Sequence, residues 1–473
     1  MAGEAGATED AATAVLARYA LGDVGHHLTA QAAEQARDTL LDTIGVALAA
    51  RNSDLVAALA RTHPGHAGPG SPTIWTSARA ADAETAAMVN GATAHALDYD
   101  DTNESIRGHL AATIWPVLLA LGEQVRPSGR ALVEAYVVGV RAAVAIADGM
   151  AIDDHYARGW HSTSTVGVVA ATCAAARLLG LTVMQARHAL GLAGSMASGS
   201  RQNFGTMTKP FHAGLAARNA VLAATLARAG FEANPSMLEG PLGYYALMDG
   251  RARLARVALS LREAWTPSRH GVSLKNYAVC YNLHRMCDAM VALKARTGLR
   301  PDAVARIRVA IEPQGKAPLI HSRPAAALEC KFSAEYALAA LLDGRSLGPA
   351  DFGDGILDGE ALQALMPRIE VCEQASPPAG SREWQEGFAV VSVELHSGET
   401  LVERVDMPKG HWGAPFSRAE LSRKFHDCVA FGFPGADAAG LEREIRGILE
   451  TDRFDGFSRL PASLAAGDSP AIV

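Results

Sequence analysis

The feature of this sequence that most constrains its fold is a long series of apolar segments with a helical period, which fills the first 268 residues. In residues 131–147, for example, apolar side chains recur at helical spacing, and Glu134 and Arg141 interrupt them on one face. Short loops that contain Gly, Ser or Pro separate such segments. An aromatic share of only 6% and abundant Gly and Ala favour closely packed helices over an aromatic-rich sandwich. This part of the chain therefore predicts a bundle of helices.

Local signals place several helix ends. Residues 163–179 form one predicted helix, and Gly180 follows in the position where a glycine commonly ends a helix. Thr182 and Gln185 have the spacing of a capping box, which predicts the start of the next helix.

The pattern changes in the second half of the chain. Residues 304–312 and 389–395 alternate apolar and polar side chains, as half-buried strands do. Turn residues after the second run predict a hairpin with residues 400–405. Helical patterns lie between these runs, notably at 333–342, and resume from Ser417 onward.

We therefore predict a mainly α protein in which a large all-helical domain carries an inserted, smaller α+β domain. The helical domain comprises residues 1–268 plus 409–473, and the α+β domain comprises residues 269–408. A chain of 473 residues is long enough for one large domain and one smaller one.

Charge and composition exclude several classes of function. The formal net charge is −7, whereas nucleic-acid binding needs a basic surface, so we predict no nucleic-acid partner. No apolar run approaches about 18 uninterrupted residues, and the start at Met1 lacks the pattern of a secretory signal. We therefore expect a soluble, cytoplasmic protein with no membrane partner. The scattered cysteines form no Cys-x-x-Cys pair, which predicts neither a zinc site nor disulfides.

The densest polar cluster is HALDYDDTNE at residues 95–104, followed by His109. It ends an apolar helical stretch, so its carboxylates lie at the negative end of a helix dipole. Asp98 lies three residues from His95 and four from Thr102, so each pair shares a helix face if the helix persists. A carboxylate beside an imidazole and a hydroxyl suits proton transfer. The alternative is a solvated acidic loop that caps the following helix.

A second cluster, GWHSTST at residues 159–165, immediately precedes a helix rich in small residues. Its hydroxyls can cap that helix, whose free amides and positive end form an anion site. His161 would add a hydrogen-bond donor or a proton carrier. The alternative is a simple helix cap with a packed tryptophan.

The third cluster spans residues 203–212 and contains Lys209 and His212. Because Lys209 precedes a proline, we expect it to be extended, with Pro210 as the first residue of a helix that runs to Gly230. An ammonium group at the positive end of a helix is locally unfavourable and indicates a bound anion that both can hold. The alternative is a solvent-exposed lysine.

A fourth candidate, HGVSLKNY at residues 270–277, lies near the predicted domain junction, where ligand sites are common. Its Lys275 and Tyr277 are candidate substrate-binding residues, with His284 and Arg285 close behind. A structural role at the hinge is the alternative. Taken together, the clusters predict a cationic pocket for a small polycarboxylate, with an internal base that removes a proton next to a carboxylate.

These segments, in this order, resemble the MmgE/PrpD family, which includes 2-methylcitrate dehydratases, cis-aconitate decarboxylases and an iminodisuccinate epimerase. The resemblance runs over almost the whole chain. The matching motifs are NG at residues 90–91, HALDYDDT at 95–102, GWH at 159–161, GTMTKPFHAG at 205–214, KFSAEY at 331–336 and RKF at 423–425.

The resemblance implies a helical domain with an α+β lid, a homodimer, and a site between the domains that uses no metal and no other cofactor. It implies that Asp98 is a base or acid near the substrate with Thr102 beside it, and that His161 and Lys209 are its partners. The resemblance also implies that His109 is a catalytic residue. The family usually has His-Pro about six residues beyond the threonine, whereas His109 lies seven residues beyond Thr102 and precedes a leucine. The hinge sequence also differs from that of the family, because this chain has Tyr-Ala-Val-Cys at residues 277–280 where family members often have Tyr-Pro-Cys.

Within the family, one carbanion has several fates: loss of hydroxide is dehydration, loss of carbon dioxide is decarboxylation, and reprotonation on the other face is epimerisation. We favour a hydro-lyase of the 2-methylcitrate dehydratase type, because this is the commonest assignment in the family. A magnesium-dependent terpene synthase is a remote alternative, because Asp100-Asp101-x-x-Glu104 imitates its acidic motif. A non-catalytic helical scaffold is the third possibility.

Overall fold

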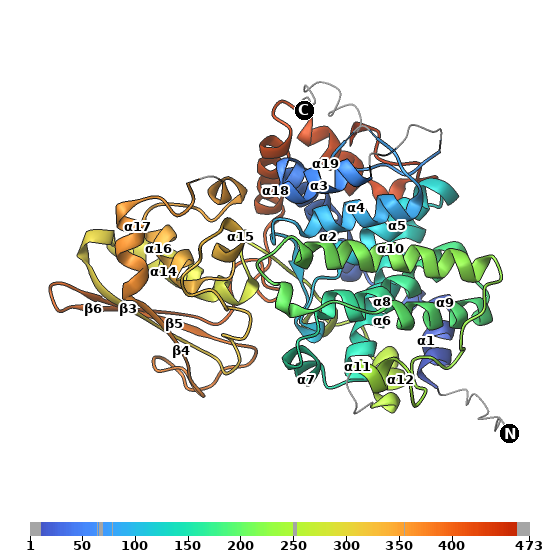
Figure 1. Ribbon diagram of the computed structural model, residues 1–473, viewed down its shortest axis with the longest axis horizontal. Coiled ribbons are helices and arrows are strands. Elements are labelled where there is room, and N and C mark those ends of the chain that lie inside the picture. Colours follow the sequence, from blue (N-terminus) through green and yellow to red (C-terminus); the bar gives the residue numbers. More distant parts are fainter. Residues whose placement is uncertain are drawn as a thin grey trace.

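The computed structural model describes residues 11–460 except 64, 66–69, 78, 249–252 and 354. The N-terminal residues in which we found no signal pattern lie outside this range. A large helical body and a smaller α+β part lie side by side (Figure 1). The prediction of a mainly α protein is confirmed.

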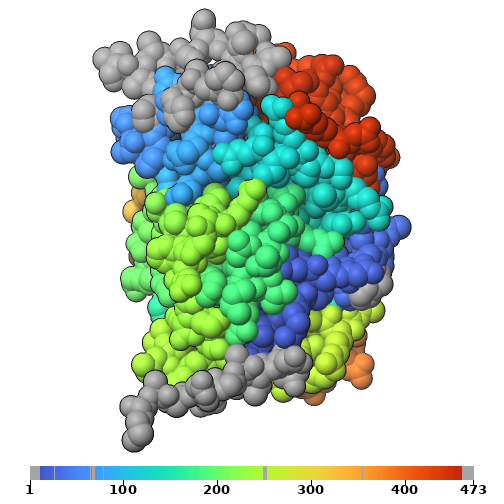
Figure 2. Space-filling view, turned by 90° about the vertical axis from the view of Figure 1, so that its right-hand side faces the viewer, coloured from blue at the N-terminus to red at the C-terminus, as the bar shows by residue number. Residues whose placement is uncertain are grey.

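The helical body is formed by the N-terminal half of the chain and by the C-terminal helices. Figure 2 shows the end of this body that faces away from the sheet, where N-terminal (blue), central (green) and C-terminal (red) segments form one continuous surface. Its helices are α1 (Ala12–Leu21), α2 (Ala30–Ala49), α3 (Asp54–Thr62), α4 (Ala83–His95), α5 (Ala111–Val125), α6 (Gly129–Asp148), α7 (Ile152–Ala157), α8 (Ser162–Leu179), α9 (Val183–Met196), α10 (Thr208–Arg228), α11 (Tyr244–Met248), α12 (Leu254–Arg262), α13 (Pro267–His270), α18 (Arg418–Gly432) and α19 (Ala438–Arg446).

Helix α8 lies in the middle of this body, between α5, α6, α9 and α10. It is long and apolar enough to cross a membrane, but 83% of it is buried inside the protein, so packing against neighbouring helices accounts for its apolar composition. Gly180 ends the helix in the left-handed conformation, and Thr182 and Gln185 form a capping box at α9, as predicted.

Helices α4 and α10 pack closely because glycines lie where they touch. A Cβ atom on Gly214 would lie 2.2 Å from the carbonyl oxygen of Met88, and one on Gly91 would lie 3.1 Å from the Cα of Gly214. Small residues at this contact let the two backbones approach. The contact brings the C-terminal end of α4 and the start of α10 together.

The α+β part is built on one sheet with the strand order β4-β3-β5-β6 in the described ranges, in which β3 and β4 run parallel and the other pairs antiparallel. Helices α14, α16 and α17 lie on one face of this sheet (Figure 1). The strands near 304–312, 389–395 and 400–405 are confirmed, whereas β4 was not predicted. The elements are α14 (His284–Thr297), β3 (Val304–Ile311), α15 (Ala327–Cys330), α16 (Ala334–Leu342), α17 (Glu360–Leu365), β4 (Ile369–Glu373), β5 (Ala389–Leu395) and β6 (Thr400–Val405).

Each part has its own apolar core. The larger core draws its buried side chains from residues 12–274 and 421–460, and the second draws them from residue 204 and from residues 277–393. The domain boundaries at 268/269 and 408/409 stay a prediction.

A short two-stranded ladder connects the segments that carry the site. Strand β1 (Asp101–Thr102) pairs antiparallel with β2 (Ser273–Leu274), so that Asp101 faces Leu274. This pairing brings residue 275 next to the loop that follows α4. The C-terminal helix α18 then packs on α2 of the helical body, and Ser417 and Glu420 form its capping box.

Candidate active site

A cavity of about 390 Å³ lies at the junction of the helical body and the α+β part, and residues from both line it. The structure brings most of the predicted site residues together here. Those that line the cavity are Asp98, Thr102, His109, His161, Lys209 and Lys275.

Asp98 lies at the centre of this group, in the turn that follows α4. The helix ends at His95, and Asp98 has a left-handed φ of 51°, so it does not share a helix face with His95 or Thr102. Its Oδ1 accepts hydrogen bonds from the Nζ atoms of Lys209, at 2.8 Å, and Lys275, at 2.5 Å. Lys275 also donates to the main-chain oxygen of Asp98 at 2.9 Å.

The two ammonium groups determine the charge of Asp98. Burial alone would raise the pKa of this carboxyl group, but Lys209 and Lys275 together hold the pKa well below its usual value. Asp98 is therefore an ionised partner of the two lysines. A carboxylate held in this way is a weak proton acceptor, so its predicted role as the base is less favourable than its role in orienting the lysines.

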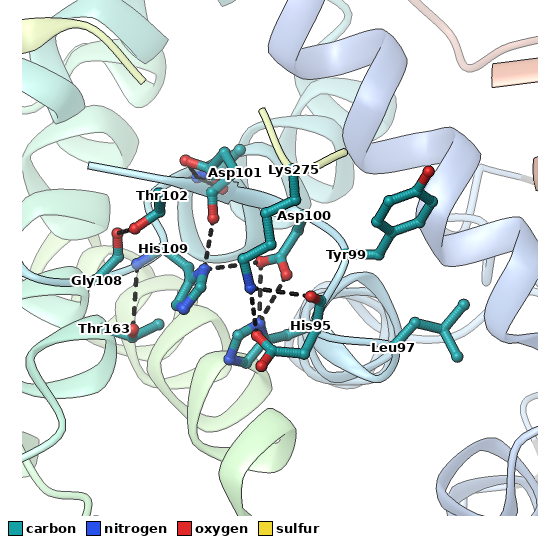
Figure 3. A network of polar contacts seen from close by, with 12 residues as sticks. His95, Leu97, Tyr99, Asp100, Asp101, Thr102, Gly108, His109, Thr163 and Lys275 are labelled. Atoms are coloured by element: carbon teal, nitrogen blue, oxygen red, sulfur yellow. Dashed lines mark hydrogen bonds and ion pairs between the residues drawn. The ribbon is translucent and has the colours of Figure 1, made fainter. Parts of the chain in front are cut away.

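His95, Asp100 and His109 form a second group beside Lys275, and their side chains point toward one another (Figure 3). The Nδ1 atom of His95 lies 2.9 Å from both carboxylate oxygens of Asp100. Burial would raise the pKa of Asp100, but His95 and His109 lower it below the usual value. The carboxylate partner of His95 is thus Asp100, five residues away, rather than Asp98.

His109 has one ring nitrogen fixed and one available. Its Nδ1 atom lies 2.5 Å from the carbonyl oxygen of Asp101, which only accepts, so Nδ1 carries the hydrogen. Burial and the neighbouring His95 lower the pKa of His109 well below its usual value, which keeps the ring neutral. The Nε2 atom of a neutral ring with hydrogen on Nδ1 is a proton acceptor.

His161 is paired with the other predicted histidine of this region. Its Nδ1 atom lies 3.1 Å from Nδ1 of His212, so one ring donates to the other. Burial and Lys209 lower the pKa of His161 well below its usual value, and burial lowers the pKa of His212 to about 4. Both rings are therefore neutral near pH 7. His161 lines the cavity, whereas His212 is not among the lining residues and contacts His161 instead.

The start of α8 differs from the predicted anion site. His161 occupies the N-cap position but makes no side-chain cap. Ser162 Oγ donates to the main-chain oxygen of Arg107, and Thr163 Oγ1 accepts from the amide of His109. These hydroxyls hold the loop that carries His109, so they support the site without forming an open anion site.

Lys209 lies inside α10, because the helix begins at Thr208 rather than at Pro210. The expectation of an extended Lys209 is therefore wrong. The bias that a proline imposes on the preceding residue is a local preference. Here the amide of Lys209 bonds to Thr206 O at 3.2 Å and its side chain bonds to Asp98, and these contacts keep the residue helical.

Tyr277 lies away from the cavity. Its hydroxyl donates to Asp288 Oδ1 at 2.6 Å, within the core of the α+β part, so the predicted substrate contact is replaced by a structural one. His284 is fully buried with its ring 5.2 Å from that of Tyr277. Arg285 from the same segment does line the cavity.

Two of the aromatic residues that line the cavity, none of which was predicted, lie close to Lys209. The Nζ atom of Lys209 lies 5.4 Å from the ring centroid of Phe204 and 5.1 Å from that of Phe332. Aromatic faces at this distance stabilise an ammonium group and exclude water from it. Both residues belong to motifs that we had singled out, so the motifs contained the signal.

The carboxylates of the acidic motif that imitates a terpene synthase do not meet at one site. Asp100 bonds to His95, and Asp101 accepts from the main-chain amides at the start of α5. Glu104 faces Arg285, at 3.7 Å, and His411, at 3.6 Å. A magnesium-diphosphate site needs such carboxylates to share an ion, and here each one binds a different protein group.

The fold and the cavity define a class: a mainly helical protein whose pocket combines buried lysines, neutral histidines and one ionised aspartate. The MmgE/PrpD N-terminal domain model matches residues 14–256 and the MmgE/PrpD C-terminal domain model matches residues 277–448. The chain belongs to the MmgE/PrpD family, as the sequence motifs indicated.

Curated relatives are enzymes of this family. The human protein named cis-aconitate decarboxylase is 28% identical over 410 residues, which cover 84% of each chain. The mouse protein of that name is 27% identical over 414 residues, covering 85% of this chain and 83% of the relative. A cis-aconitate decarboxylase from Aspergillus terreus is 28% identical over 353 residues, or 69% of this chain and 70% of the relative. This similarity is consistent with a lyase.

Proposed function

We propose that this protein is a lyase that decarboxylates cis-aconitate or a closely similar small polycarboxylate. The observation that carries the proposal is the meeting of Lys209 and Lys275 on one oxygen of Asp98, at the wall of a cavity that His109 and His161 also line. Buried cations beside neutral imidazoles suit a reaction that holds carboxylates and moves a proton.

The lysines supply the carboxylate-binding groups. An ammonium group has three hydrogens to donate. Lys209 uses one of them on Asp98, whereas Lys275 uses its hydrogens on two oxygens of the same residue. The remaining hydrogens of Lys209 are the ones available to a substrate carboxylate, and Phe204 and Phe332 shield this ammonium group from water.

The histidines supply the proton transfer. In decarboxylation, the bond from carbon to one carboxylate breaks and carbon dioxide leaves. The electron pair forms a new double bond, and the former double bond takes a proton at its far carbon. His109 and His161 lie on the cavity wall and can pass that proton from water to the carbon. Neutral rings with depressed pKa values release a proton readily once they receive it.

The sequence alone favoured dehydration. We prefer decarboxylation, because the curated relatives described above are named cis-aconitate decarboxylases. Dehydration of 2-methylcitrate and epimerisation of iminodisuccinate use the same carboxylate clamps and the same proton carriers. They are therefore outcomes of the same test.

The purified protein should be incubated in D₂O with cis-aconitate, 2-methylcitrate, citrate and iminodisuccinate, one at a time, and followed by proton NMR with detection of carbon dioxide. We expect carbon dioxide from cis-aconitate together with one deuterium on a product carbon. An alkene without carbon dioxide would identify a dehydratase, and deuterium with inversion would identify an epimerase. No reaction with any of the four compounds would contradict the proposed substrate class.

We further propose that the reaction uses no metal ion and no other cofactor. His95, Asp98, Asp100 and His109 lie close enough to share a cation. However, the ammonium groups of two lysines already occupy one oxygen of Asp98, and their charge opposes the binding of a cation there. The homodimer and the cytoplasmic location remain predictions from the family resemblance and the sequence.

A further inference from the structure

Three consecutive main-chain carbonyl groups in the turn around Asp98 each accept a hydrogen bond from a lysine. Leu97 O accepts from Lys331 at 2.8 Å, and Tyr99 O accepts from Lys424 at 2.9 Å. The carbonyl of Asp98, between them, accepts from Lys275 at 2.9 Å. The donors come from parts of the chain that are far apart in sequence.

Two of these lysines have no place in the mechanism above. Lys331 and Lys424 are buried, with exposed fractions of 3% and 7%, and neither lines the cavity. They belong to KFSAEY and RKF, two motifs of the sequence to which the proposed function gives no role.

Each of the two lysines is fixed by further contacts. Lys331 also donates to Ala278 O at 2.7 Å and lies 3.7 Å from the ring centroid of Phe352. Lys424 forms an ion pair with Asp42 at 2.6 Å. The first lysine follows α15 in the α+β part, and the second belongs to α18, which packs on α2. Both nitrogens are thus held in place by elements outside the turn.

The turn needs such support. Asp98 is not a glycine, yet its φ is 51°, a left-handed conformation that costs a side-chain-bearing residue about 1 kcal/mol or more. The carbonyls that follow the end of α4 also lack partners in the helix, and unpaired buried carbonyls are costly. Figure 3 shows the side chains of Leu97 and Tyr99 pointing away from Lys275. The main-chain oxygens of both residues accept from the lysines, and the Nζ atom of Lys424 also lies 4.0 Å from the ring centroid of Tyr99.

Burial is unfavourable for a charged lysine. Burial lowers the pKa of Lys331 to about 7, although the negative charge of Asp98 acts to raise this pKa. A methionine would fill the same space at lower cost, so the contacts of the nitrogen atom must matter here.

We propose that Lys331 and Lys424 are positioning residues for the reaction: they clamp the carbonyls on either side of Asp98 and thereby aim its carboxylate at Lys209 and Lys275. Lys331 ties the turn to the α+β part and Lys424 ties it to the C-terminal helix. The site therefore becomes competent only when both segments are in place. This inference rests on the proposed function for its kinetic test, and on the geometry alone for its structural test.

The kinetic test compares Lys331→Met and Lys424→Met with Lys294→Met. Lys294 is a matched control, because its Nζ also donates to main-chain carbonyls, those of Leu341 and Leu342, at 3.0 and 3.2 Å, remote from the turn. We expect kcat per folded enzyme to fall about 10- to 100-fold in the first two variants, since small displacements of reacting groups have effects of this size. The Lys294→Met variant should keep kcat within about twofold of the wild type. Equal kcat in all three variants would overturn the proposal.

The structural test measures amide hydrogen exchange of the peptide that contains residues 96–103 in the full-length protein. It should be faster in Lys331→Met and Lys424→Met than in the wild type and unchanged in Lys294→Met. If the wild type converts none of the candidate substrates, the proposed function fails and this measurement alone decides the inference. Unchanged exchange in both variants would refute it.

If a methionine variant does not fold, the arginine variant of the same lysine takes its place in both tests. Arginine keeps the positive charge and can still donate, but its planar guanidinium group does not reproduce the geometry of the compact ammonium group. We expect folded protein with a smaller loss of kcat and a smaller rise in exchange. Wild-type values in both measurements would refute the positioning role.

Discussion

At the scale of single residues, the site depends on one carboxylate whose charge is balanced by two lysines. Oδ1 of Asp98 binds both ammonium groups, and these side chains are almost completely buried. The lysines would otherwise be cations without a partner in the protein interior. The same contact therefore serves stability and, under the proposed function, orients the groups that would bind the substrate.

We predict that Asp98→Asn lowers both turnover and stability. Removing one partner of a buried ion pair leaves the other charge uncompensated and costs about 3–5 kcal/mol of unfolding free energy. Glu370→Gln is the matched control, because Glu370 pairs with Arg306 on the surface and should change that free energy by no more than about 1 kcal/mol. Urea denaturation measures the unfolding free energy of both variants, and a turnover assay measures the activity of Asp98→Asn. Equal losses of unfolding free energy in the two variants would contradict the ion-pair account.

The difference in unfolding free energy between the wild type and Asp98→Asn should depend on pH with a definite sign. The pKa of Asp98 in the folded protein lies well below its unfolded value of about 3.9. The stabilisation is therefore complete above the unfolded pKa and is lost as the pH falls through the folded pKa. The part of this difference that comes from the titration of Asp98 itself should stay constant above about pH 5 and shrink below about pH 4. A difference that grows on acidification would show that Asp98 is protonated in the folded protein.

At the scale of elements, the contact between α4 and α10 sets the distance between Asp98 and Lys209. Asp98 follows the C-terminus of α4, and Lys209 lies in the first turn of α10. Glycines allow these helices to touch, so the geometry of the site depends on side chains that carry no chemistry.

We predict that Gly214→Ala separates these helices and reduces both stability and turnover. The new Cβ would lie 2.2 Å from Met88 O and 2.8 Å from the Cβ of Ala92, so the backbone must move. Overpacking of this kind costs about 1–3 kcal/mol. Gly353→Ala is the control, because its Cβ would meet nothing within 4 Å. The melting temperature and the turnover should both fall for Gly214→Ala only. Equal values for the two variants would contradict this prediction.

At the scale of the whole molecule, the cavity exists only where the helical body and the α+β part meet, because both line it. A polycarboxylate bound there, as we propose, would contact both parts. Its binding should therefore stabilise the assembled protein according to its concentration.

We predict that dialysis against EDTA leaves turnover within about twofold of its initial value, because the cations of this site are lysines and a divalent ion would be repelled. Citrate should raise the melting temperature equally before and after this treatment. Loss of turnover on dialysis, with recovery on adding Mg²⁺, would instead point to the cluster of His95, Asp98, Asp100 and His109 as a metal site.

Much of the fold and of the site could be predicted because it depends on local patterns. The end of α8 at Gly180 and the capping box of α9 follow from residues within one turn of the helix. Period-two alternation located β3, β5 and β6, whereas β4 is a five-residue strand whose position depends on pairing with β3. The motifs also located six of the residues that line the cavity, because several motifs contribute side chains to one place.

The sequence by itself determined that the chain is mainly helical, that it belongs to this family and that several charged residues of its motifs meet at one site, since periodicity and motifs are properties of the chain. Only the tertiary structure decided that His95 pairs with Asp100, that Lys209 is helical, and that Tyr277 faces the core. Only the tertiary structure joined Lys331 and Lys424 to the turn at Asp98. These contacts link residues by position in space, and the left-handed turn that they hold has a local cost that only distant partners offset.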